Sequence, residues 1–73
     1  MKEEFEIRAM GFGELAQLYL PDILPLSASI RLRAWINMNK ELSTALSQMG
    51  FKKRIKTLTP KMVSLIVEHL GPP

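Results

Sequence analysis

The sequence predicts a single, mainly α-helical domain of four helices over residues 1–73. Three observations support this fold class. Apolar side chains recur at helical spacing in four stretches, and proline or glycine follows three of them. A chain of 73 residues has room for one hydrophobic core at most. The apolar content of 47% and the charged content of 23% are those of an ordinary folded protein.

The first expected helix covers residues 12–20. Its apolar stripe consists of Phe12, Leu15, Ala16, Tyr19 and Leu20. Pro21 ends this helix, and Pro25 keeps the preceding residues extended. The connection over residues 21–26 is apolar, and we expect two of its three large apolar side chains to pack beneath the core. These are Ile23, Leu24 and Leu26.

The central expected helix covers residues 28–38, with Ser27 as its N-cap and Ser29 as the alternative. Ala28, Leu32, Trp35 and Ile36 fall on one side of this helix. The opposite side consists of Ser29, Ile30, Arg33, Ala34 and Asn37. We expect the side with the only tryptophan to pack in the core, because tryptophan has a large apolar area. The opposite side is then left to contact a partner.

Two further helices are expected at residues 40–49 and 60–70. Asn39 is the N-cap of the first, and Gly50 suits the left-handed position at its end. Phe51 then falls where it packs on Leu46 in a Schellman motif. Thr59-Pro60 is a strong start for the last helix, and Gly71 ends it. The expected core of the domain is Leu15, Ala16, Tyr19, Leu32, Trp35, Ile36, Leu42, Leu46, Phe51, Met62, Ile66 and Leu70.

A short two-stranded β ribbon is expected to join residues 4–8 to residues 54–58. The first segment alternates apolar and charged residues, which is the period of a strand with one solvated face. In this pairing Glu4 and Glu6 would face lysine and arginine across the ladder. The alternative for the second segment is an irregular loop.

The net charge of +3 is unevenly distributed. Residues 1–14 are acidic overall, whereas residues 51–73 hold five basic side chains against the single carboxylate of Glu68. The basic residues are Lys52, Lys53, Arg54, Lys56 and Lys61. Such a cluster either binds an anionic partner or only keeps a loop soluble.

The sequence contains no enzyme motif: it lacks a glycine-rich phosphate loop, an H-E-x-x-H pair and a nucleophile elbow. It has no cysteine, and His69 is its only histidine. We therefore expect no catalytic function, no metal and no cofactor. The acidic start is unlike a signal peptide, and no stretch approaches the roughly 20 apolar residues of a membrane span. We expect a cytoplasmic protein without a membrane partner.

The order of the first two helices predicts a helix-turn-helix-like domain that binds double-stranded DNA in a regulatory or architectural role. The first helix, with Glu14-Leu15-Ala16, would support a second helix that enters the major groove. The expected contacts are Ser27, Ser29, Ile30, Arg31, Arg33, Asn37, Lys52, Lys53, Arg54 and Lys56. Two features count against DNA: the connection exceeds the about 3–4 residues of a tight motif, and Ile30 and Ala34 are apolar. The alternative is a protein-interaction or self-association module that uses Ile23, Leu24, Leu26, Ile30 and Ala34.

A set of motifs along nearly the whole chain carries a resemblance to a known family. The motifs are Phe12 with Glu14-Leu15-Ala16, Leu18-Tyr19, Pro21, Ser27-Ala28-Ser29, Leu32, Trp35-Ile36, Asn39, Leu42, Leu58-Thr59-Pro60, Glu68-His69-Leu70-Gly71 and Pro73. They resemble short proteins of Bacteroides-type bacteria that are catalogued as a domain of unknown function. The resemblance implies a small intracellular protein of helix-turn-helix-like character. Where that family has polar or basic residues, this chain has Leu26, Ile30 and Ala34, a departure that weakens an inherited DNA role and favours self-association.

Overall fold

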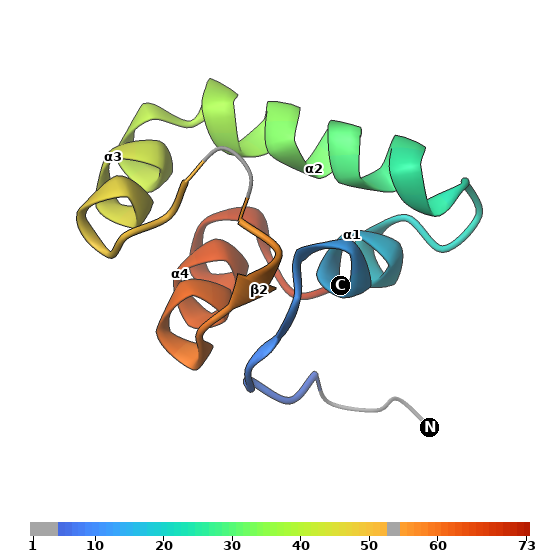
Figure 1. Ribbon diagram of the computed structural model, residues 1–73, viewed down its shortest axis with the longest axis horizontal. Helices are drawn as coiled ribbons and strands as arrows, with labels where there is room; N and C mark the ends of the chain where they lie inside the picture. Colours follow the sequence, from blue (N-terminus) through green and yellow to red (C-terminus); the bar gives the residue numbers. More distant parts are fainter. Residues whose placement is uncertain (1–4, 53–54) are drawn as a thin grey trace.

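The computed structural model describes residues 5–52 and 55–73, and these residues form four helices and one two-stranded sheet (Figure 1). In chain order the elements are β1 (Met10–Gly11), α1 (Phe12–Tyr19), α2 (Pro25–Met38), α3 (Lys40–Gln48), β2 (Thr57–Leu58) and α4 (Pro60–Leu70). The mainly α-helical fold class with a short ribbon is therefore confirmed. In Figure 1 the longest helix, α2, lies along one edge of the molecule, and the other helices lie on one side of it.

The ribbon exists, but the predicted position of its first strand is wrong. The antiparallel partners are Met10 with Leu58 and Gly11 with Thr57, whereas the prediction used residues 4–8. Burial explains the register, because Met10 and Leu58 both enter the core while residues 6–9 are exposed. The expected charge pairing is wrong for Glu6, which is exposed and lies before the first ladder residue, Met10. Glu4 and Arg54, also expected in this pairing, lie outside the described residues.

Helix α2 begins earlier than predicted. Its N-cap is Leu24, in extended conformation at φ −62° and ψ 149°, and Pro25 occupies the first helical position. The prediction of Ser27 as N-cap is wrong because a proline, which has no N–H and a fixed φ, is already suited to the first turn. The connection from α1 covers residues 20–24, and Gln17 holds it in place. Its Nε2 donates hydrogen bonds to the carbonyl oxygens of Leu20 at 3.1 Å and Ile23 at 2.9 Å.

The predicted ends of the other helices agree with the structure to within one residue. The side chains of Asn39 and Thr59 accept hydrogen bonds from the backbone N–H groups three residues later, at 3.0 and 3.3 Å, as N-caps do. Gly50 adopts a φ of +94°, and the N–H of Phe51 donates to the carbonyl of Leu46 at 3.0 Å. These two features confirm the Schellman motif at the end of α3.

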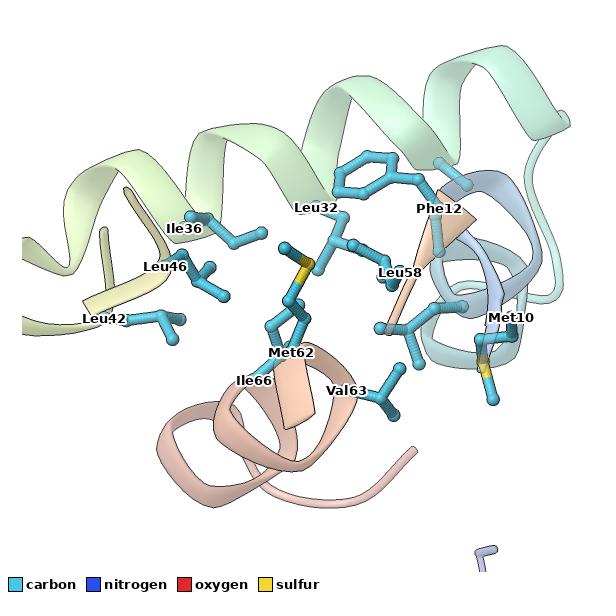
Figure 2. Close-up of a cluster of buried hydrophobic side chains, with 13 residues drawn as sticks. Met10, Phe12, Leu32, Ile36, Leu42, Leu46, Leu58, Met62, Val63 and Ile66 are labelled. Carbon is cyan, nitrogen blue, oxygen red and sulfur yellow. The ribbon is translucent and has the colours of Figure 1, made fainter. Parts of the chain in front are cut away.

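The core lies between α2 and α4, with α1 and α3 at its sides (Figure 2). Its buried members are Met10, Phe12, Leu15, Ala16, Ala28, Leu32, Ile36, Leu42, Leu46, Leu58, Met62, Val63 and Ile66. Four residues predicted to be core members are only partly buried and pack against this cluster: Tyr19, Trp35, Phe51 and Leu70. Trp35 lies at the border of the core, where its ring meets the ring of Tyr19 edge-on at 6.2 Å. The Tyr19 hydroxyl donates to the Gly71 carbonyl at 2.6 Å and so joins α1 to the end of α4.

Candidate nucleic-acid interface on helix α2

Helix α2 has one covered side and one uncovered side. Ala28, Leu32 and Ile36 are at most 1% exposed, because they face α1 and the rest of the core. On the uncovered side, four apolar residues at intervals of four form a row along the helix: Leu26, Ile30, Ala34 and Met38. We call these four the outer row. Leu26 is 74%, Ile30 61% and Met38 81% exposed.

A polar row runs beside the outer row on one flank of α2. It consists of Ser29, Arg33 and Asn37, again at intervals of four. Ser29 and Arg33 line a shallow groove together with Ile55 and Lys56, from the segment that precedes β2. Lys56 is held there by its backbone, because its carbonyl accepts a hydrogen bond from the N–H of Phe12 at 2.8 Å. The structure thus brings Lys56, one of the predicted basic contacts, next to the predicted contact helix.

Arg33 is positioned by an aromatic ring. Its guanidinium carbon lies 4.5 Å from the centroid of the Phe12 ring, which is the geometry of a cation–π contact. Asn37 is exposed and lies one turn further along the helix, where a second hollow is lined by Arg33, Asn37 and the two serines of α3. Those serines are Ser43 and Ser47.

The opposite flank of α2 carries the remaining predicted contacts of the helix. Arg31 and Ser27 are exposed and line a hollow with Ile30 and the connection that follows α1. At the other end of the basic segment, Lys52 is exposed, and its carbonyl accepts a hydrogen bond from the Ile55 N–H at 3.1 Å. Lys53 and Arg54, the other predicted contacts, lie outside the described residues.

The predicted apolar surface is only partly correct. Ile23 packs against the core, whereas Leu24 and Leu26 are both 74% exposed, so one rather than two of these side chains is covered. Met38 belongs to the exposed surface and was missed by the prediction. Its position four residues after Ala34 is the sequence signal that would have found it.

Arg8, Glu14, Tyr19 and His69, which lie outside α2, make contacts within the fold. Arg8 donates to the Glu14 carboxylate at 2.9 Å, and the Gly11 N–H donates to it at 3.3 Å, so both contacts lower the pKa of Glu14. Burial raises the pKa of Tyr19 to about 12. The Nδ1 of His69 lies 3.0 Å from the Leu65 carbonyl, on its own helix. Among the described residues, no group of three or more potential ligands is placed to hold a metal ion.

These features define a small, mainly α-helical domain with a short antiparallel ribbon and one helix exposed along its length. No helix in the described part of the chain has the length and apolar character needed to cross a membrane. The profile of the family described as domain of unknown function DUF4248 matches residues 6–73, and the chain belongs to this family. A comparison with curated proteins and with solved structures finds no match.

Proposed function

We propose that the protein binds double-stranded DNA by placing α2 in the major groove. The observation that carries this proposal is the position of Lys56, whose segment lies beside Ser29 and Arg33 of α2. Residues that carry a hydroxyl, a guanidinium and an ammonium group then line one groove, and all three groups are common ligands of phosphate. Helix α2 contains no aspartate or glutamate that would repel a polyanion.

The distribution of charge around α2 suits a groove with two anionic walls. At 3.6 residues per turn, Arg33 and Arg31 project about 80° to either side of the direction midway between Ile30 and Ala34. A B-DNA major groove is about 12 Å wide and admits an α-helix, with base edges at its floor and phosphates along both sides. Arg31 would meet one phosphate wall, while Arg33 and Lys56 would meet the other.

The packing behind α2 supports the same proposal. Ala16 of α1 is fully buried, and such a small residue permits close approach of two helices. Gln17 holds the connection between the helices through two hydrogen bonds. A helix that is braced in this way presents its outer residues in a defined direction, as recognition of a groove requires.

The proposal is tested by fluorescence anisotropy with a labelled duplex over a series of salt concentrations. Wild-type protein is expected to bind at low salt and to lose affinity steeply as salt rises, because phosphate contacts release counterions. Arg31→Gln and Lys56→Gln should each weaken binding and reduce the salt slope by about one. Lys61→Gln is the matched control, since Lys61 is an exposed lysine on α4, across the core from α2 (Figure 2).

Two results would contradict DNA binding. One is wild-type protein that shows no anisotropy change at low salt. The other is binding that survives Arg31→Gln, Lys56→Gln and the combined change of Lys52, Lys53 and Arg54 to glutamine as well as it survives Lys61→Gln.

A second candidate function is contact with a protein through the outer row. The observation that favours it is the exposure of Leu26, Ile30 and Met38, because contiguous apolar surface commonly marks an interface. Leu24, also exposed, lines one hollow with Ile30. Sedimentation at rising concentration tests self-association: a self-associating chain gains mass, and Ile30→Asp returns it to a monomer. A chain that stays monomeric throughout argues against this candidate.

A further inference from the structure

The outer row places apolar groups where a DNA-binding helix reaches furthest into the groove. Ile30 and Ala34 point almost directly away from the buried side of α2, and both are exposed. We infer that they contact the C5 methyl groups of thymine, so that the protein prefers duplexes rich in A·T pairs. This inference rests on the proposed DNA binding and specifies how that same surface would select sequence.

The chemistry of the major groove explains the choice of ligand. The thymine methyl is the only methyl group that the four ordinary bases expose at the groove floor, and it is the group that apolar side chains contact there. Over a G·C pair, Ile30 and Ala34 would cover the guanine acceptors and the cytosine amino group without replacing their hydrogen bonds to water. Buried polar groups without partners are costly. The outer row therefore favours A·T pairs and disfavours G·C pairs.

Asn37 is placed to strengthen the same preference. It is exposed and lies one turn beyond Ala34 and Arg33, close to the outer row. Asparagine forms a bidentate hydrogen bond with adenine in the major groove. An asparagine beside apolar side chains thus matches the two features that an A·T pair presents, the adenine edge and the thymine methyl.

The charges on α2 favour DNA over a second copy of this chain as the occupant of the outer row. Arg31 lies on one flank, and Arg33 and the Lys56 segment lie on the other. Two copies packed through this row would bring arginine-bearing flanks together, and α2 offers no carboxylate to neutralise them. A duplex supplies phosphates on both sides of the helix.

The test distinguishes recognition of the methyl group from recognition of the base pair that carries it. Affinity is measured for four duplexes of equal length: one A·T-only sequence made with thymine or with uracil, and one G·C-only sequence made with cytosine or with 5-methylcytosine. Uracil lacks only the methyl, and 5-methylcytosine adds it to a G·C pair. We expect thymine to be preferred over uracil, and 5-methylcytosine over cytosine, by about fourfold for each methyl contacted.

Two variants test whether the preference for thymine over uracil comes from the outer row. Ile30→Ser should remove most of the preference for thymine over uracil while the salt dependence persists, because the phosphate contacts are unchanged. Leu18→Ser is the matched control: it removes an exposed apolar side chain from α1 and should leave the preference intact. Circular dichroism verifies that both variants keep their helices.

The outcomes distinguish this inference from the proposed function. Equal affinity for the thymine and uracil duplexes, together with steep salt dependence, would overturn methyl reading and leave DNA binding standing. Absence of binding to all four duplexes at low salt would overturn both. A thymine preference that persists in Ile30→Ser would also overturn the assignment to the outer row.

Discussion

The apolar residues on the two sides of α2 differ in burial and therefore in their contribution to stability. On the inner side, Leu32 and Ile36 are buried against the core, and their contribution is to stability. On the outer side, Leu26 and Ile30 have similar hydrophobicity but lie in solvent. The same helix therefore shows that apolar character alone does not assign a residue to the core. What decides is the angular position relative to the elements that pack behind the helix.

The largest expected effect is a difference in the free energy of unfolding between substitutions on the buried and the exposed side of α2. Leu32→Ala should lower the free energy of unfolding by about 2–5 kcal/mol, because it leaves a cavity among residues that cannot fully collapse. Ile30→Ala should change it by no more than about 0.5 kcal/mol, as for an exposed position. Urea unfolding followed by circular dichroism measures both. Equal effects of the two substitutions would show that the two sides of α2 contribute equally to stability, contrary to this account.

Trp35, on the border between the two sides, should give an intermediate effect. It is half-buried and packs against Tyr19, so Trp35→Ala should cost about 2 kcal/mol, less than the roughly 3–5 kcal/mol of a fully buried aromatic residue. Trp35→Phe, which keeps a ring for Tyr19, is the milder control. An alanine variant that unfolds at the same urea concentration as wild type would show that the tryptophan does not pack there.

Substitution of Arg33 and of Arg31 should affect stability differently, because the two arginines lie on opposite flanks of α2. Arg33 lies over the Phe12 ring, so Arg33→Gln should cost about 0.5–1 kcal/mol. Arg31, exposed on the opposite flank, should tolerate the same substitution without measurable loss of stability. Thermal unfolding of both variants gives the difference, and a greater loss for Arg31→Gln would reverse the assignment of the flanks.

The last expected effect, a pH dependence at Tyr19, is confined to alkaline pH. Burial raises the pKa of Tyr19 from 10.0 to about 12, so the folded state holds the phenol proton more tightly than the unfolded state does. This contribution is complete below pH 10 and should be lost as the pH rises from about 10 to about 12. Urea unfolding at several alkaline pH values should therefore show a steeper loss for wild type than for Tyr19→Phe. Parallel pH profiles would contradict the shift.

Much of the fold is predictable from the sequence because its signals are local. Gly50, Asn39 and Thr59 act through their own turns, so the helix ends follow from neighbouring residues alone. Helix α2 shows the limit: Ser27 is a suitable N-cap by its side chain, but Pro25, expected only to keep the connection extended, takes the first helical position. The strand register does not follow from the alternation in residues 4–8, because it is set by the burial of Met10 and Leu58 in the tertiary core.

The candidate site was predictable only in part. The outward residues of α2 follow from helical periodicity, but the approach of Lys56 to Ser29 and Arg33 does not. It depends on the pairing of β2 with β1, which places the Lys56 carbonyl against the N–H of Phe12 at the start of α1. The stacking of Arg33 on Phe12 has the same tertiary origin. Neither contact leaves a local signal in the sequence.

Amide chemical shifts during titration with an A·T-only duplex at low salt test the central claim most directly. If the uncovered side of α2 binds DNA, the largest shifts will fall on Ile30, Arg31, Ala34, Asn37 and Lys56, while the exposed amides of α4 will change little. Shifts that are absent at every ratio, or that concentrate on α4 instead, would contradict the account.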